Sequence, residues 1–491
     1  MKNRTLIFSI LLSISLFSCE GFLDKYPHSD VAFEQSLKNQ NDMEVGVAGM
    51  YSGFKSASYY GRYFTVYPDI MTDEVAAING FSNQLGILYK WIYTATDGDI
   101  TAMWASMYSV IARANTIINS IDNIEGDTDL LNYLKGEALT ARALAHFDLV
   151  RLFAKPYDAS TASTDLGVPY MKEFVISEPP RDNIQSVYDN IINDLNAAYP
   201  LLNHSPYDEK ADTHFSQTAV NAILARAYLY MKNWDQAISF AQKCIDSDNY
   251  SLAIGNDFKD MWINDVSEEI IWKVGLTVND AAGHYPGYNY YNDSQGLPDP
   301  DYMPTDNFLS IYDQENDIRY QTYFANVETK YGVSLTLCDK YPTNPEFAAT
   351  SNATGANMPK VLRLAEQYLI CAEAYAEKGD AATAWQYIQS IRASRIDNYN
   401  PATDVMPSNV KSEIFEERKR ELAFEGHLWF DYKRKGLGFE RQGRSDSGNN
   451  VMTNEINSLV IEESNNRWIL PIPQDELNAN SGMTGQQNPG Y

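Results

Sequence analysis

The chain has 491 residues, of which 44% are hydrophobic and 21% are charged, so its composition is that of a globular protein. Its formal net charge of −27 excludes nucleic acid and anionic lipid surfaces as main partners, because both attract positively charged proteins. The length is sufficient for a large core and for more than one domain.

The N-terminus has the pattern of a secretory signal peptide. Lys2 and Arg4 precede an apolar run at residues 6–17, which is shorter than the roughly 20 residues that span a bilayer as a helix. A small residue then precedes Cys19, and this arrangement is similar to a lipobox, in which lipid is attached to the cysteine after cleavage. We therefore predict removal of residues 1–18 and lipidation of Cys19, which would anchor the chain to a membrane without spanning it. An ordinary signal peptide followed by a chance cysteine is the alternative.

Two segments are predicted to be helical hairpins. In residues 219–245 and 362–395, apolar residues recur every three or four positions along two helices that are joined by a short polar turn. This design is typical of tetratricopeptide repeats, and "LARAYLYMKNWDQAISFAQKCI" matches it well. We expect a mainly α fold built on such hairpins, whose unequal spacing excludes a simple solenoid.

Residues 249–360 separate the two hairpins and differ from them in composition. They are rich in Asn, Asp, Pro, Gly and Tyr and carry few helical stripes, and insertions of this length in a compact chain tend to be functional loops. A strand-like run at residues 269–274 precedes the stretch "HYPGYNYYND" at residues 284–293. Proline and glycine punctuate the end of the chain, which we expect to be an ordered tail that wraps around the body.

The sequence contains no recognisable catalytic or metal-binding motif. The six histidines lack metal spacing, and the HExxH, GxSxG, P-loop and GxGxxG patterns are absent. Cys244 and Cys371 lie on apolar helix stripes and are predicted to be core residues. Glu421 and Glu425 lie four residues apart, too close along one helix to flank a glycosidic bond, and with Glu417 they are interpreted as an ion-paired helix face. We therefore predict no catalytic residue, no metal site and no cofactor.

Several segments, in the right order along residues 19–491, resemble the SusD/RagB family of outer-membrane lipoproteins. The segments that carry this resemblance are "CEGFLDKYP", "WASMYSVIARANTIINSI", "KGEALTARALAHFDLVRLFAKPY", "VLRLAEQYLICAEAYAEKGDAATAWQYIQSIRASR", "ERKRELAFEGHLWFDYKRKG" and "ILPIPQDELNAN" with the terminal "GQQNPGY". The resemblance implies one SusD-like domain over residues 19–491, an α–α superhelix of tetratricopeptide-like hairpins with long irregular loops and a few short strands.

The same resemblance implies a function. A SusD-like chain is expected to be lipid-anchored at the outer membrane and exposed at the cell surface, where it captures an oligosaccharide. It would deliver this ligand to a SusC-like TonB-dependent transporter and act as its lid. Peptide capture, known in some members, is the alternative within the family.

Aromatic side chains outside the helices are the candidate ligand contacts, because a ring stacks on the face of a sugar while amide and carboxylate groups bond its hydroxyls. Residues 58–63 are a further candidate, for the ligand site or for the transporter contact. In the family, the loop that corresponds to residues 91–99 often supplies a stacking ring. The predicted ligand-binding residues are Trp91, Tyr93, Asp97, Asp73, Tyr285, Tyr288, Tyr290, Tyr291 and Asn292.

Two of these predictions have specific alternatives. For Asp73, a role in turn and helix-cap chemistry is slightly favoured over ligand contact. The tyrosine-rich stretch lies where no family motif can be placed, so we expect that replacing Tyr288, Tyr290 and Tyr291 with Ala weakens binding and leaves the thermal unfolding midpoint nearly unchanged.

Two other classes of function are open at this point. A surface glycoside hydrolase would release sugar from a glycan, whereas a binding protein would release none. A purely structural tetratricopeptide scaffold would bind no small ligand and would bury the loop tyrosines against its body.

Overall fold

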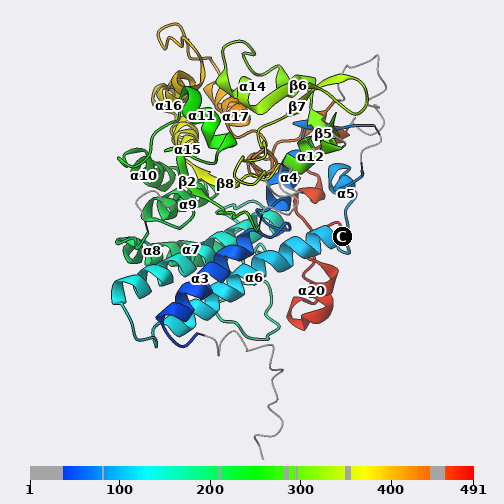
Figure 1. The fold of residues 1–491 in the computed structure, drawn as a ribbon. Helices are drawn as coiled ribbons and strands as arrows, with labels where there is room; N and C mark the ends of the chain where they lie inside the picture. The colour runs from blue at the N-terminus through cyan, green and yellow to red at the C-terminus, as the bar shows by residue number, and fades with distance from the viewer. Residues whose placement is uncertain are drawn as a thin grey trace, which may run out of the picture.

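The structure is a computed structural model, and it describes residues 37–79, 82–207, 212–280, 287–291, 293–294, 297–348, 355–442 and 459–491. The predicted signal peptide and Cys19 lie outside these ranges. About half of the described chain is helical, and its short strands pair in twos, always antiparallel (Figure 1). The prediction of a mainly α fold with few short strands is confirmed.

Four long helices form a layer at the lower side of the molecule in Figure 1. Helix α6 packs against both α3 and α7, and α7 packs against α8. Each helix begins after an Asn or Asp whose side chain accepts a hydrogen bond from a backbone N–H of the first turn, which satisfies a donor that the helix itself cannot. The four helices are α3 (Gln40–Phe54), α6 (Gly98–Ile121), α7 (Thr128–Phe153) and α8 (Ile184–Ala198).

The two predicted helical hairpins are present, and they stack on each other. The first is α9 (Gln217–Tyr230) with α10 (Trp234–Ile245), and the second is α15 (Leu364–Glu377) with α16 (Ala381–Arg395). Helix α10 packs against α15, although residues 246–363 lie between them in the sequence. Small side chains let the backbones approach, and the predicted core residues Cys244 and Cys371 are both buried.

The insertion between the hairpins contains most of the short strands. Most of it lies between two strands that are bonded to each other, β2 (Ile270–Lys273) and β8 (Lys360–Arg363), and β2 is the strand predicted from residues 269–274. The other elements of the insertion are α11 (Gly255–Ile263), α12 (Gly287–Tyr291), β3 (Asp293–Ser294), β4 (Leu297–Pro298), β5 (Tyr302–Pro304), α13 (Asp306–Leu309), α14 (Ile318–Tyr323), β6 (Phe324–Glu328) and β7 (Ser334–Cys338).

The remaining elements connect these parts and end in a tail. Arg181, before α8, donates hydrogen bonds to the Gln486 carbonyl and to the Asn488 side chain at 2.8 and 3.0 Å, so the tail wraps around the helical layer as predicted. These elements are α4 (Tyr63–Ile70), β1 (Val75–Ala77), α5 (Gly86–Tyr89), η2 (Tyr199–Leu202), α17 (Val410–Glu421), α18 (Leu428–Lys435), β9 (Phe439–Arg441), β10 (Leu459–Ile461), η3 (Asn466–Trp468), α20 (Gln474–Ala479) and η4 (Ser481–Met483).

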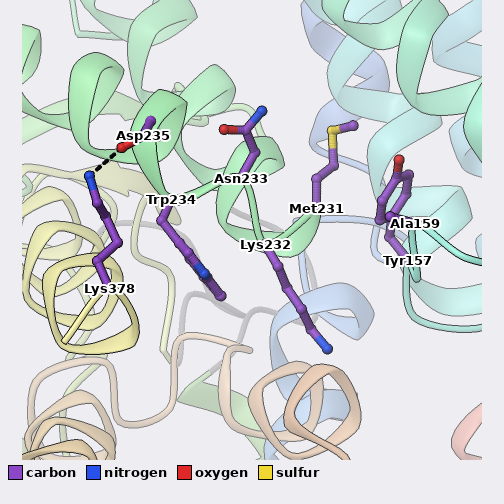
Figure 2. A pocket seen from close by; sticks show the side chains of 8 residues that line it. All are labelled: Tyr157, Ala159, Met231, Lys232, Asn233, Trp234, Asp235 and Lys378. Atoms are coloured by element: carbon purple, nitrogen blue, oxygen red, sulfur yellow. Dashed lines mark hydrogen bonds and ion pairs between the residues drawn. The ribbon is translucent and has the colours of Figure 1, made fainter.

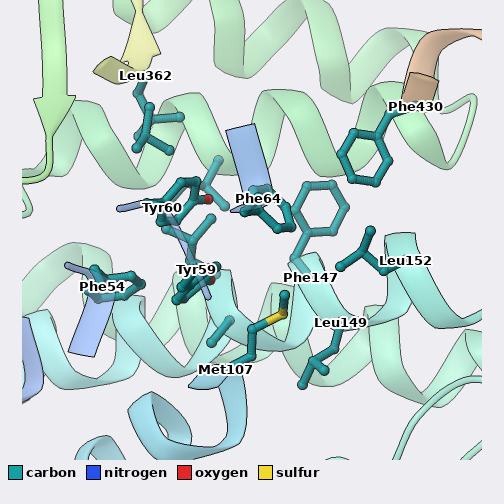
Figure 3. Close-up of a cluster of buried hydrophobic side chains, with 14 of the residues drawn as sticks. Phe54, Tyr59, Tyr60, Phe64, Met107, Phe147, Leu149, Leu152, Leu362 and Phe430 are labelled. Atoms are coloured by element: carbon teal, nitrogen blue, oxygen red, sulfur yellow. The ribbon is translucent and has the colours of Figure 1, made fainter. Parts of the chain in front are cut away.

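The largest hydrophobic cluster joins the helical layer to the elements above it (Figure 3). Tyr59 and Tyr60 stack at its centre, with ring centroids 4.5 Å apart, and their hydroxyls donate to one carboxylate oxygen of Asp148 at 2.6 and 2.7 Å. Arg151 bonds the other oxygen of that carboxylate. The expectation that residues 58–63 line a ligand or transporter surface is therefore wrong for these two tyrosines, because their rings are buried in the core and their hydroxyls are bonded to Asp148.

A buried ion cluster connects the insertion to the second hairpin. Glu421, the last residue of α17, accepts hydrogen bonds from Arg319 of α14, Arg363 of β8 and Arg395 of α16, at 3.2, 3.0 and 2.9 Å. Burial by itself would raise the pKa of Glu421, but the three guanidinium groups outweigh it and hold this pKa well below its usual range. Glu425, beyond the helix end, also pairs with Arg363. The interpretation of these glutamates as structural ion pairs is confirmed.

Because Glu421 is a buried carboxylate paired with three buried arginines, Glu421→Gln is expected to lower the free energy of unfolding by about 3 to 5 kcal/mol. The matched control is Glu377→Gln, which breaks an exposed pair with Lys411 and is expected to cost about 1 kcal/mol or less. Urea denaturation of both variants measures the difference, and equal values would contradict the role assigned to the cluster.

Candidate ligand-binding surfaces

Three segments that are far apart in the sequence meet at one place, which we call the loop-rich surface: residues 62–63, 82–84 and 287–291. Arg62 connects the three segments through hydrogen bonds. Its Nε donates to the Asn289 side-chain oxygen at 2.8 Å, and its Nη2 donates to the Gln84 side-chain oxygen at 2.5 Å. Tyr302 donates to the Gln84 carbonyl at 2.6 Å. The tyrosine-rich stretch is thus bonded to residues 58–63, the further candidate segment.

Tyr63 is a half-buried aromatic residue of the loop-rich surface. Tyr63 stacks on Tyr67 with ring centroids 4.8 Å apart, and the Arg62 guanidinium lies 5.6 Å from the Tyr63 ring centre. A half-buried ring beside amide and guanidinium groups is the combination that binds a sugar face and its hydroxyls. Arg62 belongs to the candidate segment 58–63, whereas Gln84 was not predicted, because it lies in none of the aromatic-rich segments that the sequence singled out.

The tyrosine-rich stretch is partly a core element. Tyr290 is 0% exposed, its ring packs edge-on against Phe424 at 5.3 Å, and its hydroxyl has no hydrogen-bond partner among the described residues. Asn289 is also buried. The predictions that Tyr290 contacts ligand and can be replaced without loss of stability are therefore wrong, because tertiary packing closes over its ring.

The backbone of this stretch approaches its neighbours closely at Gly287. A Cβ at this position would lie 2.6 Å from the carbonyl oxygen of Tyr341 and 2.8 Å from the Cα of Gly355, so only glycine fits. Tyr291 is half-buried and packs against a small apolar cluster that includes Met303. Tyr285, Asn292 and the side chain of Tyr288 lie outside the described residues, and their predicted ligand contacts remain predictions.

The side chains of Trp91 and Tyr93 pack between the body of the molecule and its C-terminal tail. The Trp91 indole N–H donates to the Met71 carbonyl at 2.8 Å, and its ring packs edge-on against Trp468 at 4.8 Å. Tyr93 bonds the Arg467 carbonyl and stacks on Tyr491. Both rings are buried, so the expectation that they offer a stacking face to a ligand is wrong for this structure.

The two predicted aspartates have structural partners. Asp97 caps α6 by accepting from the Asp99 backbone N–H at 3.0 Å. Asp73 accepts a hydrogen bond from the Tyr432 hydroxyl at 2.8 Å and lies 3.9 Å from the Lys419 ammonium. Helix-cap chemistry therefore accounts for Asp97. Asp73 is instead engaged by a tyrosine hydroxyl and a lysine ammonium, and among the described residues the structure gives its carboxylate no turn or cap contact.

Two buried carboxyl groups lie close to Tyr290. Burial raises the pKa of Glu74 from 4.5 to about 8, against the lowering effect of the Phe424 backbone N–H that it accepts at 2.9 Å. Burial likewise raises the pKa of Asp69 well above its usual value, and the neighbouring Glu74 raises it further. Within the described ranges, no group of three or more His, Cys, Asp or Glu side chains is arranged to hold a metal ion.

A cavity of about 400 Å³ opens beside the turns of the two hairpins, and we call it the hairpin-turn cavity (Figure 2). Trp234 and Lys232 extend to the same side of the first turn, and an ion pair between Asp235 and Lys378 closes one end (Figure 2). The sequence signal that could have found it is an aromatic residue inside a polar turn. The lining residues are Tyr157, Ala159, Met231, Lys232, Asn233, Trp234, Asp235 and Lys378.

Comparison with known families agrees with this architecture. The profile described as the SusD family matches residues 279–491, and a second profile, described as "Starch-binding associating with outer membrane", matches residues 21–229. This chain belongs to the SusD family. The resemblance noted in its sequence is confirmed.

Relatives of this SusD-family chain cover its whole length. SusD-like protein P2 of Formosa agariphila is 25% identical over 100% of both chains. A crystal structure of a SusD superfamily protein from Bacteroides thetaiotaomicron has a TM-score of 0.78 and 26% identity, covering 92% of this chain and 100% of that one. A Bacteroides vulgatus structure, described as a candidate sugar binding protein, has a TM-score of 0.78 and 28% identity, covering 93% and 99%.

In this SusD-family chain the core role of Tyr290 has two measurable consequences. Tyr290→Ala is expected to lower the free energy of unfolding by about 3 to 5 kcal/mol, since it empties a packed ring site. Tyr290→Phe keeps the ring and removes a buried hydroxyl without a described partner, so stability is expected to stay equal or rise. Denaturant titration of both variants measures the free energy of unfolding. An unchanged free energy for Tyr290→Ala would contradict the assignment of this ring to the core.

The raised pKa of Glu74 predicts a dependence of stability on pH. The folded chain holds this proton up to about pH 8, whereas the unfolded carboxyl releases it near 4.5, so stability falls as pH rises between these values. Glu74→Gln keeps an oxygen acceptor for Phe424 without a charge. We expect it to raise the thermal midpoint at pH 8 and to change it little at pH 4.5.

The control for this measurement is Glu463→Gln, which changes an exposed carboxylate and is expected to leave the midpoint unaltered at both pH values. If Glu74→Gln follows the parent chain across this range, the carboxyl is charged in the folded state and the assignment fails.

Proposed function

We propose that this chain binds a carbohydrate and does not cleave it. The observation that carries the proposal is the match of residues 21–229 to a profile described as starch-binding and associated with the outer membrane. The Bacteroides vulgatus relative described as a candidate sugar binding protein supports the same class of ligand. The loop-rich surface and the hairpin-turn cavity agree with it chemically, since each places aromatic rings beside amide and charged groups.

The position of the acidic residues favours binding over hydrolysis. A glycosidase needs two carboxyl groups on opposite sides of the scissile bond, both accessible to the substrate. Glu421 and Glu425 are held in buried ion pairs with Arg363, and Glu74 and Asp69 are buried as well. We therefore infer a protein that captures its ligand and releases it unchanged.

We further propose that lipidated Cys19 anchors the chain at the outer membrane and that its partner is a SusC-like TonB-dependent transporter, for which it serves as a lid. None of the helices within the described ranges is long and apolar enough to cross a membrane. The family profile that names association with the outer membrane supports the location. The energy of transport would come from the partner.

The main sugar contact is assigned to the loop-rich surface, with Tyr63 as the stacking ring and Gln84 as a hydrogen-bonding group. The contacts predicted for Tyr288 and Tyr291 belong to the same surface. The hairpin-turn cavity, with Trp234, is the second candidate. A half-buried ring in each surface, Tyr63 in one and Trp234 in the other, allows the two to be separated by single substitutions.

Calorimetry of the mature chain against neutral and acidic oligosaccharides and against peptides tests the proposal. We expect heat of binding with at least one oligosaccharide and no sugar released on prolonged incubation. Tyr63→Ala is expected to weaken this binding by about tenfold or less, because an aromatic contact contributes about 0.5 to 1.5 kcal/mol. Binding of peptides alone, or release of sugar, would overturn the proposal.

Two further variants locate the site. Trp234→Ala weakens binding only if the hairpin-turn cavity holds the ligand. Tyr199→Ala is the matched control, because it removes a half-buried tyrosine at the end of α8, on the other side of the molecule from α5 and α12 (Figure 1). Equal weakening by all three substitutions would indicate a general loss of folded protein.

A further inference from the structure

The segment between α7 and α8 exposes three consecutive apolar side chains. Residues 171–181 have no regular secondary structure and lie against α6 of the helical layer, and we call them the strap. Phe174 and Val175 are 51% and 54% exposed, and Ile176 is fully exposed at 108%. Single exposed apolar residues are common on soluble proteins, but a contiguous run of this kind usually marks a contact with a partner or a membrane.

The strap is held at both ends. On one side, the side-chain amides of Asn115 and Asn119 of α6 donate to the carbonyls of Met171 and Lys172 at 3.0 and 3.1 Å. The three exposed residues 174–176, which we call the tip, are therefore attached to α6 through this end of the strap.

On the other side, the tail fixes the strap. Asn480 donates to the Pro179 carbonyl at 3.0 Å, and the Ser481 backbone N–H donates to the Glu178 carboxylate at 3.1 Å. Gly482 approaches so closely that a Cβ there would lie 2.2 Å from the Glu178 carbonyl oxygen. With both ends bonded, the three apolar side chains have no route into the core.

The strap lies at the end of the molecule where the described chain begins. Leu37, the first described residue, lies next to Gly46 of α3, and Ile117 of α6 lies next to the same glycine. Asn119, half a turn further along α6, bonds the strap. Figure 1 shows the start of α3 and the strap on the same, lower side of the molecule.

We propose that Phe174, Val175 and Ile176 insert into the lipid bilayer beside the N-terminal anchor. The inference rests on the proposed lipidation of Cys19. The 18 residues from there to Leu37 reach at most about 60 Å when extended, so the anchor keeps the point where the described chain begins within that distance of the membrane. The contact is apolar and suits neutral headgroups, because the net charge of −27 disfavours an anionic surface.

The cysteine content of the chain permits a direct test. Cys244, Cys338 and Cys371 are buried, and Cys19 carries lipid under the proposal, so Ile176→Cys introduces a single exposed thiol. An environment-sensitive fluorophore at this thiol is measured in the full lipidated chain bound to phosphatidylcholine vesicles. We expect emission at shorter wavelengths than in detergent-free buffer, and quenching by nitroxide-labelled lipid.

The matched control is Val405→Cys, labelled in the same way. Val405 is 82% exposed and belongs to the segment between α16 and α17, at the opposite end of the molecule (Figure 1). Its fluorophore is expected to stay aqueous and unquenched. A second control replaces all three apolar residues of the tip with Ser, which is expected to leave the thermal midpoint unchanged because these side chains are exposed.

Three results would overturn the proposal. The first is equal, aqueous emission from both labelled positions. The second is a shift at position 176 that appears only when the transporter is also present, which would assign the tip to a protein contact. The third is a lowered midpoint for the triple Ser variant. Mass spectrometry of the N-terminal peptide measures acylation separately, so failure of the anchor is distinguished from failure of the tip contact.

Discussion

The carboxylate of Glu421 is the point on which the upper part of the structure depends. Three arginines from three separate elements, α14, β8 and α16, converge on it in a region closed to water. Transfer of so many charges from water is costly, and the cost is offset only while every partner is in place. The cluster therefore fixes the relative positions of these elements, since a shift of any one of them breaks buried ion pairs.

This constraint extends to the ligand surfaces. Most of the insertion lies between the paired strands β2 and β8, and Arg363 of β8 belongs to the ion cluster. Its loops therefore project from a rigid base, as binding loops generally do. Arg62 then bonds the insertion to α4 through Asn289, which fixes the loop-rich surface from the other side.

The sequence predicted the elements whose signals are local. The hairpins, β2, the ion-paired glutamates and the buried cysteines all follow from periodicity and spacing within short windows. The candidate ligand residues were predicted less well, because the exposure of a side chain depends on segments that are distant in the sequence. Trp91 and Tyr93 are covered by Trp468 and Tyr491, nearly 400 residues further along the chain. The sequence around Trp91 and Tyr93 therefore contains no signal that they are buried. A tyrosine in a turn-rich segment has the same composition whether a tail lies over it or not.

The stacking of α10 on α15 has a consequence for the order of folding. The α9–α10 hairpin closes through a turn of three residues and can form early, whereas its contact with α15 must wait for residues 246–363 to be closed into a loop. Until then the small-residue face of α10 remains open to water and to other chains. We therefore expect the contact between the two hairpins to form late, and a chain interrupted before α15 to expose a surface prone to aggregation.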